Sequence, residues 1–427
     1  MNDTRSTSTP MSPDQTVFDG IGMRAKIALR LLHALKVGEL EVIFPDGSTR
    51  LYRGSDTTRA PAQPEHRAHF LIHDFEALSL AVSRGDIGFG EGYMRGLWSS
   101  HNLTALLRLM IANREAMQAV IYGRWWSTWI DQLRHLLRSN RKAQAKKNIS
   151  AHYDLGNDFY ALWLDPTMTY SSALFDCAGA AHQPVDLQAG QERKIDRAIA
   201  QLKPNRFDER SKVLEIGCGW GGLANRLLQN TNCHYKGLTL SSEQQAWAQQ
   251  VLSRHGRQRF DVALQDYRDE HHLYDGIVSI EMFEAVGERY WNAYFSTLAR
   301  CLKDDGRAVI QTITIDEQLF QRYRSGTDFI QQYIFPGGML PSKTIFTQLA
   351  QRHGLAIEDA FCFGQDYGRT LAEWAKTFDA KRSEIERMGF NTEFQRMWRF
   401  YLSYCEAGFA EGNIDVVQFT LCLSNSR

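Results

Sequence analysis

The feature that most constrains this chain is a glycine-rich turn between a short apolar run and a helical segment. Residues 213–217 read VLEIG and continue into Gly217-Cys218-Gly219-Trp220-Gly221-Gly222, and the following LANRLL has the apolar spacing of a helix. Glycine permits the tight backbone that an extended ligand needs at the switch point of a parallel sheet, and a helix N-terminus favours a carboxylate or phosphate. The turn indicates a cofactor site in an α/β domain, although an isolated pair of glycines can also be a packing turn.

The residues around the turn narrow the class of cofactor. Glu215 gives the spacing E-x-G-x-G-x-G, which is typical of motif I in class I methyltransferases, whereas dinucleotide-binding enzymes carry G-x-G-x-x-G. The next predicted strand ends in GLTLSSEQ (237–244), without the acidic residue about 20 positions on that binds an NAD ribose. A nicotinamide enzyme is therefore disfavoured.

Five short apolar runs separated by helical stretches predict a doubly wound α/β domain. They read KVLEIGCG, HYKGLTLS, RFDVALQD, YDGIVSIE and RAVIQTIT, beginning at Lys212. Ligands gather at the carboxyl ends of parallel strands, where the third run ends in Gln265-Asp266 and the fourth in Glu281-Met282-Phe283-Glu284. The amide of Gln265 and the carboxylate of Asp266 are suited to hydrogen-bonding the edge of an adenine.

The chain is too long for one domain of ordinary size. We expect a disordered tail over 1–19, a smaller N-terminal α+β domain for lipid binding or dimerisation over 20–140, and a catalytic methyltransferase domain over 141–427. In the smaller domain, residues 21–36 have helical spacing and a hairpin turns at Pro45-Asp46-Gly47. A strand, short helices interrupted by glycines and a helix from about Leu103 to Met117 follow.

Charge and cysteine content exclude several classes of function. Lys+Arg and Asp+Glu both number 49, so no basic excess attracts nucleic acid, and no N-P-P-[YF]-like motif for a flipped base is present. Seven scattered cysteines without a C-x-x-C pair fit a reducing cytosol. The polar start has no apolar core of a secretory signal, and no run reaches about 18 apolar residues. We therefore expect a cytoplasmic protein.

Tryptophan and basic residues share the segment 121–148, IYGRWWSTWIDQLRHLLRSNRKAQAKKN. Such a stretch suits the surface of an anionic bilayer, where tryptophan lies at the headgroup level. A domain-packing helix followed by a solvated charged linker is the other interpretation, and the residues leave both open.

At this point a family resemblance emerges. GCGWGGLA, GLTLSSEQ, QDYRD and MFEAVG resemble cyclopropane fatty acid synthases in order and spacing, as do HYDLGNDFYALWLDPTMTYSSALF, YIFPGGMLPS and GQDYGRTL. The resemblance covers about 147–427 well and 20–146 more weakly. It implies a class I methyltransferase of Rossmann-like fold that uses S-adenosylmethionine. The residues implied to line the cofactor site are Tyr170, Ser171, Gly217, Gly219, Thr239, Gln244, Gln265 and Asp266.

The resemblance also implies a small pocket in which a bicarbonate ion acts as base. The matching positions are Ser172, Glu284, Gln311, Ile313 and Tyr367. Ser172 stands where these enzymes commonly carry Cys, and Gln311 where they carry His. Both can still hydrogen-bond an anion, so the bicarbonate site can survive; alternatively, Glu284 acts directly as the base.

The expected chemistry is methyl transfer to an alkene, which needs a dry, aligned site and yields a carbocation. Aromatic faces can stabilise that cation, and the candidates are Tyr170, Phe283, Tyr333 and Phe335, each of which is otherwise a core residue. The proton removed next decides the product. The leading hypothesis is cyclopropane formation on unsaturated phospholipid acyl chains; the rival product is a methyl-branched, methylene or methylated unsaturated chain.

Two further hypotheses remain beside this one. A class I methyltransferase acting on a small soluble nucleophile would have no use for the N-terminal domain. A non-catalytic protein that binds lipid and S-adenosylmethionine would be expected to have degraded glycines, which are intact here. We expect unsaturated phospholipids at the membrane surface as partners, a homodimer through the N-terminal domain, no nucleic acid and no metal, with reversible attachment to the inner membrane face.

Overall fold

A computed structural model describes residues 22–56, 66–121, 155–175 and 186–424 of the chain. The chain divides into two units, Met1–Arg124 and Trp125–Arg427, and each is treated separately below. The expected domain boundary near residue 140 and the segment rich in tryptophan and arginine lie outside the described residues, apart from Ile121. Both therefore stay predictions.

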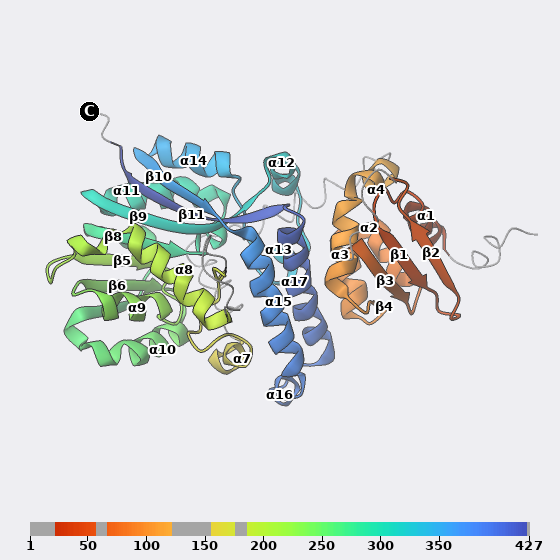
Figure 1. Ribbon diagram of the computed structural model, residues 1–427, viewed down its shortest axis with the longest axis horizontal. Helices are drawn as coiled ribbons and strands as arrows, with labels where there is room; N and C mark the ends of the chain where they lie inside the picture. Colours follow the sequence, from red (N-terminus) through yellow and green to blue (C-terminus); the bar gives the residue numbers. More distant parts are fainter. Residues whose placement is uncertain (1–21, 57–65, 122–154, 176–185, 425–427) are drawn as a thin grey trace, which may run out of the picture. The chain divides into compact units, whose positions relative to one another are not determined.

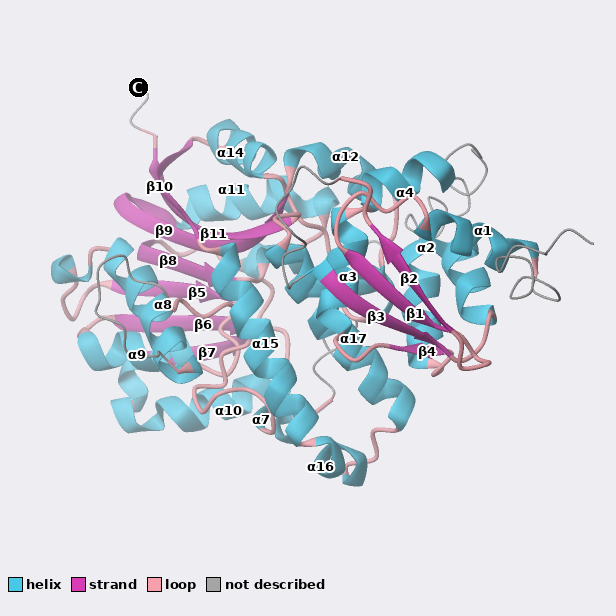
Figure 2. Cartoon of the chain, turned by 45° about the vertical axis from the view of Figure 1, so that its right-hand side comes forward, coloured by secondary structure: helices cyan, strands magenta, loops and turns pink. Residues whose placement is uncertain are grey.

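The N-terminal unit is a four-stranded sheet with helices, as Figure 2 shows. Its elements are α1 (Met23–Leu32), β1 (Glu39–Ile43), β2 (Thr49–Arg53), β3 (Arg67–Ile72), α2 (Glu76–Met94), β4 (Trp98–Ser99), α3 (Leu103–Ala112) and α4 (Arg114–Ile121). The strand order is β2-β1-β3-β4, with β1 antiparallel to β2 and parallel to β3. The expected hairpin is confirmed: Asp46 accepts hydrogen bonds from the backbone and side chain of Ser48, and Gly47 has a φ of +83°.

The prediction of one continuous helix from about Leu103 to Met117 is wrong. Residues 103–117 form two helices, because Asn113 lies between them and its side chain is fully engaged. Its carbonyl oxygen accepts from Lys36 N at 2.7 Å and Val37 N at 3.0 Å, and its amide donates to Val37 O at 3.0 Å and Leu109 O at 2.9 Å. A buried polar side chain must satisfy its hydrogen bonds, and here it does so by joining two distant parts of the chain.

The larger unit contains a seven-stranded sheet in the order β10-β11-β9-β8-β5-β6-β7 (Figure 1). The strands are β5 (Lys212–Ile216), β6 (His234–Thr239), β7 (Phe260–Leu264), β8 (Tyr274–Ile280), β9 (Leu302–Ile315), β10 (Leu355–Cys362) and β11 (Ile414–Leu423). The five predicted strands, β5 to β9, are all present and pair with one another in parallel. β10 and β11 were not predicted; β11 runs antiparallel to both β9 and β10.

Helices cover both faces of this sheet. The α-helices are α7 (Asn157–Ala161), α8 (Leu187–Gln201), α9 (Gly222–Asn230), α10 (Ser242–Leu252), α11 (Trp291–Cys301), α12 (Glu317–Ser325), α13 (Phe329–Tyr333), α14 (Lys343–Arg352), α15 (Gly364–Ala380), α16 (Arg382–Arg387) and α17 (Thr392–Ala410). Adjacent strand residues serve opposite cores: Val213 and Val309 pack with α8, α9 and α10, whereas Leu214 and Ile310 pack with α11 and α14. This alternation explains why the central strands are apolar throughout.

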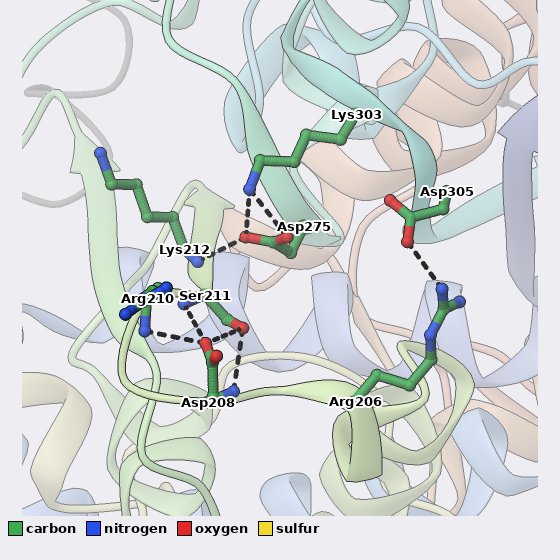
Figure 3. A network of polar contacts seen from close by, with 8 residues as sticks. All are labelled: Arg206, Asp208, Arg210, Ser211, Lys212, Asp275, Lys303 and Asp305. Atoms are coloured by element: carbon green, nitrogen blue, oxygen red, sulfur yellow. Dashed lines mark hydrogen bonds and ion pairs between the residues drawn. The ribbon is translucent and has the colours of Figure 1, made fainter.

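Polar contacts fix the amino-terminal edge of the sheet (Figure 3). The Asp275 carboxylate at the start of β8 accepts from Lys212 N at 2.7 Å and from the Lys303 ammonium at 2.8 Å. Arg206 contacts Asp305 at 2.6 Å. These ties hold the beginnings of β5, β8 and β9 together, and the opposite edge, where the strands end, carries the glycine-rich turn. No helix of the described part of the chain is long and apolar enough to cross a bilayer.

Candidate active site

The glycine-rich turn connects β5 to α9, as predicted. Gly217, Gly219 and Gly221 all have positive φ, at 83°, 51° and 86°, a region that glycine adopts without strain. A Cβ on Gly217 would lie 2.7 Å from the Met282 side chain, whereas one on Gly219 would meet nothing within 4 Å. Gly217 is therefore needed for packing, whereas the backbone at Gly219 borders open space.

Thr239 and Gln244 come together beside this turn, where β6 ends. The Thr239 hydroxyl donates to Gln244 Oε1 at 2.9 Å and accepts from Ser241 N at 3.1 Å, and both side chains are buried. Their mutual hydrogen bond fixes the orientation of both polar side chains at the end of β6. That Thr239 and Gln244 line a cofactor site stays a prediction.

Gln265 and Asp266 also lie at this edge, directly after β7, but their side chains already have partners. The Gln265 amide donates to Glu270 at 3.2 Å, and Asp266 forms two hydrogen bonds with Arg268 at 2.8 and 2.6 Å. The predicted adenine contacts would therefore have to share or replace these bonds.

Tyr170 and Ser171 lie in the segment between α7 and α8. The Tyr170 hydroxyl is 2.7 Å from that of Tyr401, and its ring packs beside Trp374 with centroids 5.4 Å apart. The hydroxyl of Ser171 accepts from the Lys194 ammonium at 2.5 Å. Tyr170 is thus held by α15 and α17, and Ser171 by α8.

Glu284 has one satisfied and one unsatisfied carboxylate oxygen. Oε1 accepts from the backbone N–H of Ile313, whereas Oε2 is enclosed and has no hydrogen-bond partner. Burial, together with the neighbouring Glu281 charge, raises the pKa of Glu284 to about 8. A carboxyl in this state can hold or release a proton near neutral pH, and its free oxygen is available to a ligand.

Sequence reasoning noted Glu281 only as the end of a strand, and the structure places it at the centre of the predicted pocket. Oε1 accepts from Ser172 N at 2.9 Å and from Gln311 Nε2 at 2.7 Å, and Oε2 accepts from the Tyr367 hydroxyl at 2.5 Å. Its φ is +50°, which is uncommon for a residue with a side chain. Three positions expected to hold a bicarbonate ion thus converge on a carboxylate of the chain itself.

The donors that reach Glu281 are fixed from behind. Gln311 Oε1 accepts from Gln418 Nε2 at 2.9 Å, and Gln418 Oε1 accepts from Arg197 at 2.7 Å, so the Gln311 amide is oriented with its nitrogen towards Glu281. The Ser172 hydroxyl donates elsewhere, to Ala173 O at 2.9 Å. Ser172 therefore contributes its backbone rather than the hydroxyl that we predicted would bind an anion.

Lys194 is the second residue that sequence reasoning missed. It is fully buried in α8, and its charge interacts with Glu281, Asp165 and Glu215. Burial lowers the pKa of Lys194 to about 8, while the three carboxylates oppose that shift. A lysine on the apolar face of a helix, next to Ile195, was the signal that could have identified it.

Phe283, one of the four aromatic candidates for cation stabilisation, belongs to the core. It is fully buried and packs against Trp291, Tyr294 and Phe346. His152 and Tyr153, which we considered as part of a lid over the cofactor, lie outside the described residues.

Comparison with known proteins identifies the family of this chain. Residues 140–419 match the family described as mycolic acid cyclopropane synthetase. This chain belongs to that family. Tuberculostearic acid methyltransferase UfaA1 of Mycobacterium tuberculosis is 39% identical over 403 residues, covering 93% of this chain and 91% of that protein. Cyclopropane-fatty-acyl-phospholipid synthase of Escherichia coli is 34% identical over 345 residues, covering 79% and 83%.

Two solved structures of cyclopropane synthases support the family assignment. MmaA2 from Mycobacterium tuberculosis has a TM-score of 0.59 and 31% identity, covering 65% of this chain and 97% of that one. CmaA1 complexed with SAH and CTAB has a TM-score of 0.59 and 32% identity, with the same coverage. The predicted family and class I methyltransferase fold are confirmed. This chain is therefore an enzyme that transfers the methyl group of S-adenosylmethionine, and its relatives are named for cyclopropane formation or methylation on lipids.

Proposed function

We propose that the enzyme transfers the methyl group of S-adenosylmethionine to the double bond of an unsaturated phospholipid acyl chain at a membrane surface. The observation that carries this proposal is the pair of enclosed carboxyl groups, Glu281 and Glu284, next to the glycine-rich turn. An alkene has no proton to lose before it attacks the methyl group, so a base is needed only after the methyl transfer. The cation formed in that transfer also requires a site that excludes water.

Different residues are proposed to bind the cofactor and to accept the proton. The turn at Gly219 and the Thr239–Gln244 pair are suited to binding the cofactor, which supplies an electrophilic methyl group. The carboxyl groups face the carbocation formed on the chain, stabilise its charge and accept one proton. Both lie where β8 and β9 end, so the sheet fixes the base relative to the methyl donor.

The ring product remains the first candidate. Loss of a proton from the transferred methyl group closes a cyclopropane ring. The name of the Escherichia coli relative gives a cyclopropane as the product of that enzyme. The candidate aromatic residue Tyr170 sits among other aromatic rings, including Trp163 at 5.5 Å between centroids, and this setting suits a developing cation.

A methylated open chain is the second candidate product, and one observation favours it. The relative that covers 93% of this chain is named a tuberculostearic acid methyltransferase rather than a cyclopropane synthase. Loss of a proton from a chain carbon next to the cation would give an open, methylated unsaturated chain.

The proposal extends to partners and location. It stays a prediction that the substrate is an unsaturated phospholipid at the inner membrane face, that the protein is cytoplasmic and attaches reversibly, and that it forms a homodimer through the N-terminal unit. The segment 121–148, with its tryptophans and basic residues, is the sequence feature that supports membrane attachment.

The direct test is mass spectrometry of acyl chains after incubating the purified protein with S-adenosylmethionine and phospholipid vesicles. Vesicles of a monounsaturated phospholipid should gain one CH2, and matched saturated vesicles should gain nothing. Fragmentation then separates a ring from an open methylated chain. Cofactor binding without any mass gain would instead favour the non-catalytic alternative, and methylation of a small soluble amine or acid would contradict the lipid substrate.

A further inference from the structure

The predicted bicarbonate pocket contains a carboxylate of the chain. Ser172, Gln311 and Tyr367 direct donors to Glu281 at 2.9, 2.7 and 2.5 Å, and Ile313 directs its N–H to Glu284. These are four of the five positions that the family resemblance assigns to a bound anion. A carboxylate and bicarbonate offer the same planar pair of oxygens, so they compete for the same donors.

The residues present therefore do not fit a separate anion. A bicarbonate ion at this point would lie against the Glu281 carboxylate, and two like charges in an enclosed site strongly disfavour each other. The only buried ammonium that interacts with Glu281 among the described residues is that of Lys194, which also interacts with Asp165 and Glu215. Its single positive charge already faces three carboxylates and is not free to balance a further anion.

We propose that the Glu281 carboxylate is the base of this enzyme and replaces a bicarbonate ion. This inference rests on the proposed methyl transfer and names the group that completes it. The base thus belongs to the chain itself, directly after β8, and is fixed by three hydrogen bonds rather than recruited from solution.

The step balances as follows. The S–CH3 bond of the cofactor breaks as the alkene carbon forms a bond to the methyl carbon, which leaves a carbocation on the acyl chain. Glu281 accepts a proton from one of two positions. If the proton comes from the transferred methyl group, its C–H electron pair forms the ring bond to the cationic carbon; if it comes from a chain carbon next to the cation, the pair forms a double bond. The carboxyl group then returns the proton to water when the product leaves.

Backbone geometry supports a functional role for this side chain. A φ of +50° favours glycine, so the fold tolerates local strain to keep a carboxylate at position 281. The Gln311 amide is held in the orientation that donates to Glu281 by Gln418 and Arg197. The carboxylate is therefore preorganised for proton transfer.

Two variants of Glu281 separate this proposal from a structural role. In Glu281→Gly, glycine adopts the positive φ at this position, and the hydrogen-bond donors that reach Glu281 become free for an added anion. In Glu281→Gln, the amide fills the same space but cannot act as a base. With monounsaturated vesicles in bicarbonate-free buffer, we expect both variants to lose at least about 100-fold in rate, the lower range of a general base. Added bicarbonate should restore Glu281→Gly, leave Glu281→Gln inactive and change the wild-type rate by less than twofold.

A second readout does not depend on activity. Carbon-13 NMR of labelled bicarbonate should show binding to Glu281→Gly and none to the wild type, while melting temperatures and cofactor binding verify that each variant folds. A wild-type enzyme that binds or requires bicarbonate would overturn the proposal, as would a Glu281→Gly variant that keeps its rate without it. If the wild type methylates no lipid, the proposed function fails, and the binding experiment still decides whether Glu281 occupies the anion site.

Discussion

Replacing Tyr367 by phenylalanine tests how the pocket controls its base. The Tyr367 hydroxyl donates to Glu281 at 2.5 Å, and the ring stacks on Phe409 with centroids 4.4 Å apart. Tyr367→Phe keeps the ring and its packing but removes the donor. A hydrogen bond to a charged group contributes about 1.5–3 kcal/mol, and 1.36 kcal/mol corresponds to a factor of ten.

The direction of the pKa change in Tyr367→Phe depends on which form of Glu281 the Tyr367 hydroxyl stabilises. Burial raises the pKa of Glu281, and Tyr367 opposes that effect by binding the ionised form. Without the hydroxyl the pKa of Glu281 rises further, so the acid limb of the pH–rate profile should move upward by about one to two pH units. Below that limb the rate should fall by roughly 10- to 100-fold, and at higher pH it should approach the wild-type value.

The assay is the initial rate of methyl incorporation into vesicle lipid across a pH series, with melting temperature as a check on folding. Tyr235→Phe is the matched control, because the Tyr235 hydroxyl donates to the buried carboxylate of Glu215, also at 2.5 Å. Glu284 and Lys194 titrate in both variants, so only the difference between them reports on Glu281. An equal loss at every pH, or the same displacement in Tyr235→Phe, would refute the reasoning.

The remaining predictions concern the cofactor turn, a buried acid and the N-terminal unit. Gly219→Ala should weaken cofactor binding in calorimetry with a stability loss of only about 1–2 kcal/mol from its positive φ, whereas Gly217→Ala should cost more because its Cβ meets Met282; equal melting temperatures would contradict this distinction. Burial raises the pKa of Glu215 to about 8, above its unfolded value near 4.5, so the native state binds the extra proton and wild-type stability falls as pH rises between these values. Glu215→Gln should therefore become more stable relative to the wild type across that window in denaturant melts, and a pH-independent difference would count against it. Asn113→Ala removes four hydrogen bonds from a buried site and should destabilise the N-terminal unit by about 2–4 kcal/mol in thermal unfolding, and a loss below about 0.5 kcal/mol would show that water replaces them.

Local patterns predicted the parts of this protein that depend on neighbours in the chain. The apolar runs predicted β5 to β9, and the glycine spacing predicted the turn between β5 and α9. They could do so because strand burial and positive φ leave a direct record in residue type. β10 and β11 were missed, although β11 pairs with β9 over eight positions, because pairing between distant strands has no local signature.

The candidate site divides in the same way. The sequence by itself determined the family, the S-adenosylmethionine turn and the set of positions around the pocket, because motifs preserve residue type and spacing. Only the tertiary structure decided which of those residues contact one another. Glu281 looked like the end of a strand and Lys194 like one residue of a helix, and it is the packing of β8, α8 and α15 that brings carboxylate, ammonium and the Tyr367 hydroxyl together. Charge and hydrogen bonding act through space, so the chemistry of the pocket depends on contacts between residues as far apart in the chain as Ser172 and Tyr367.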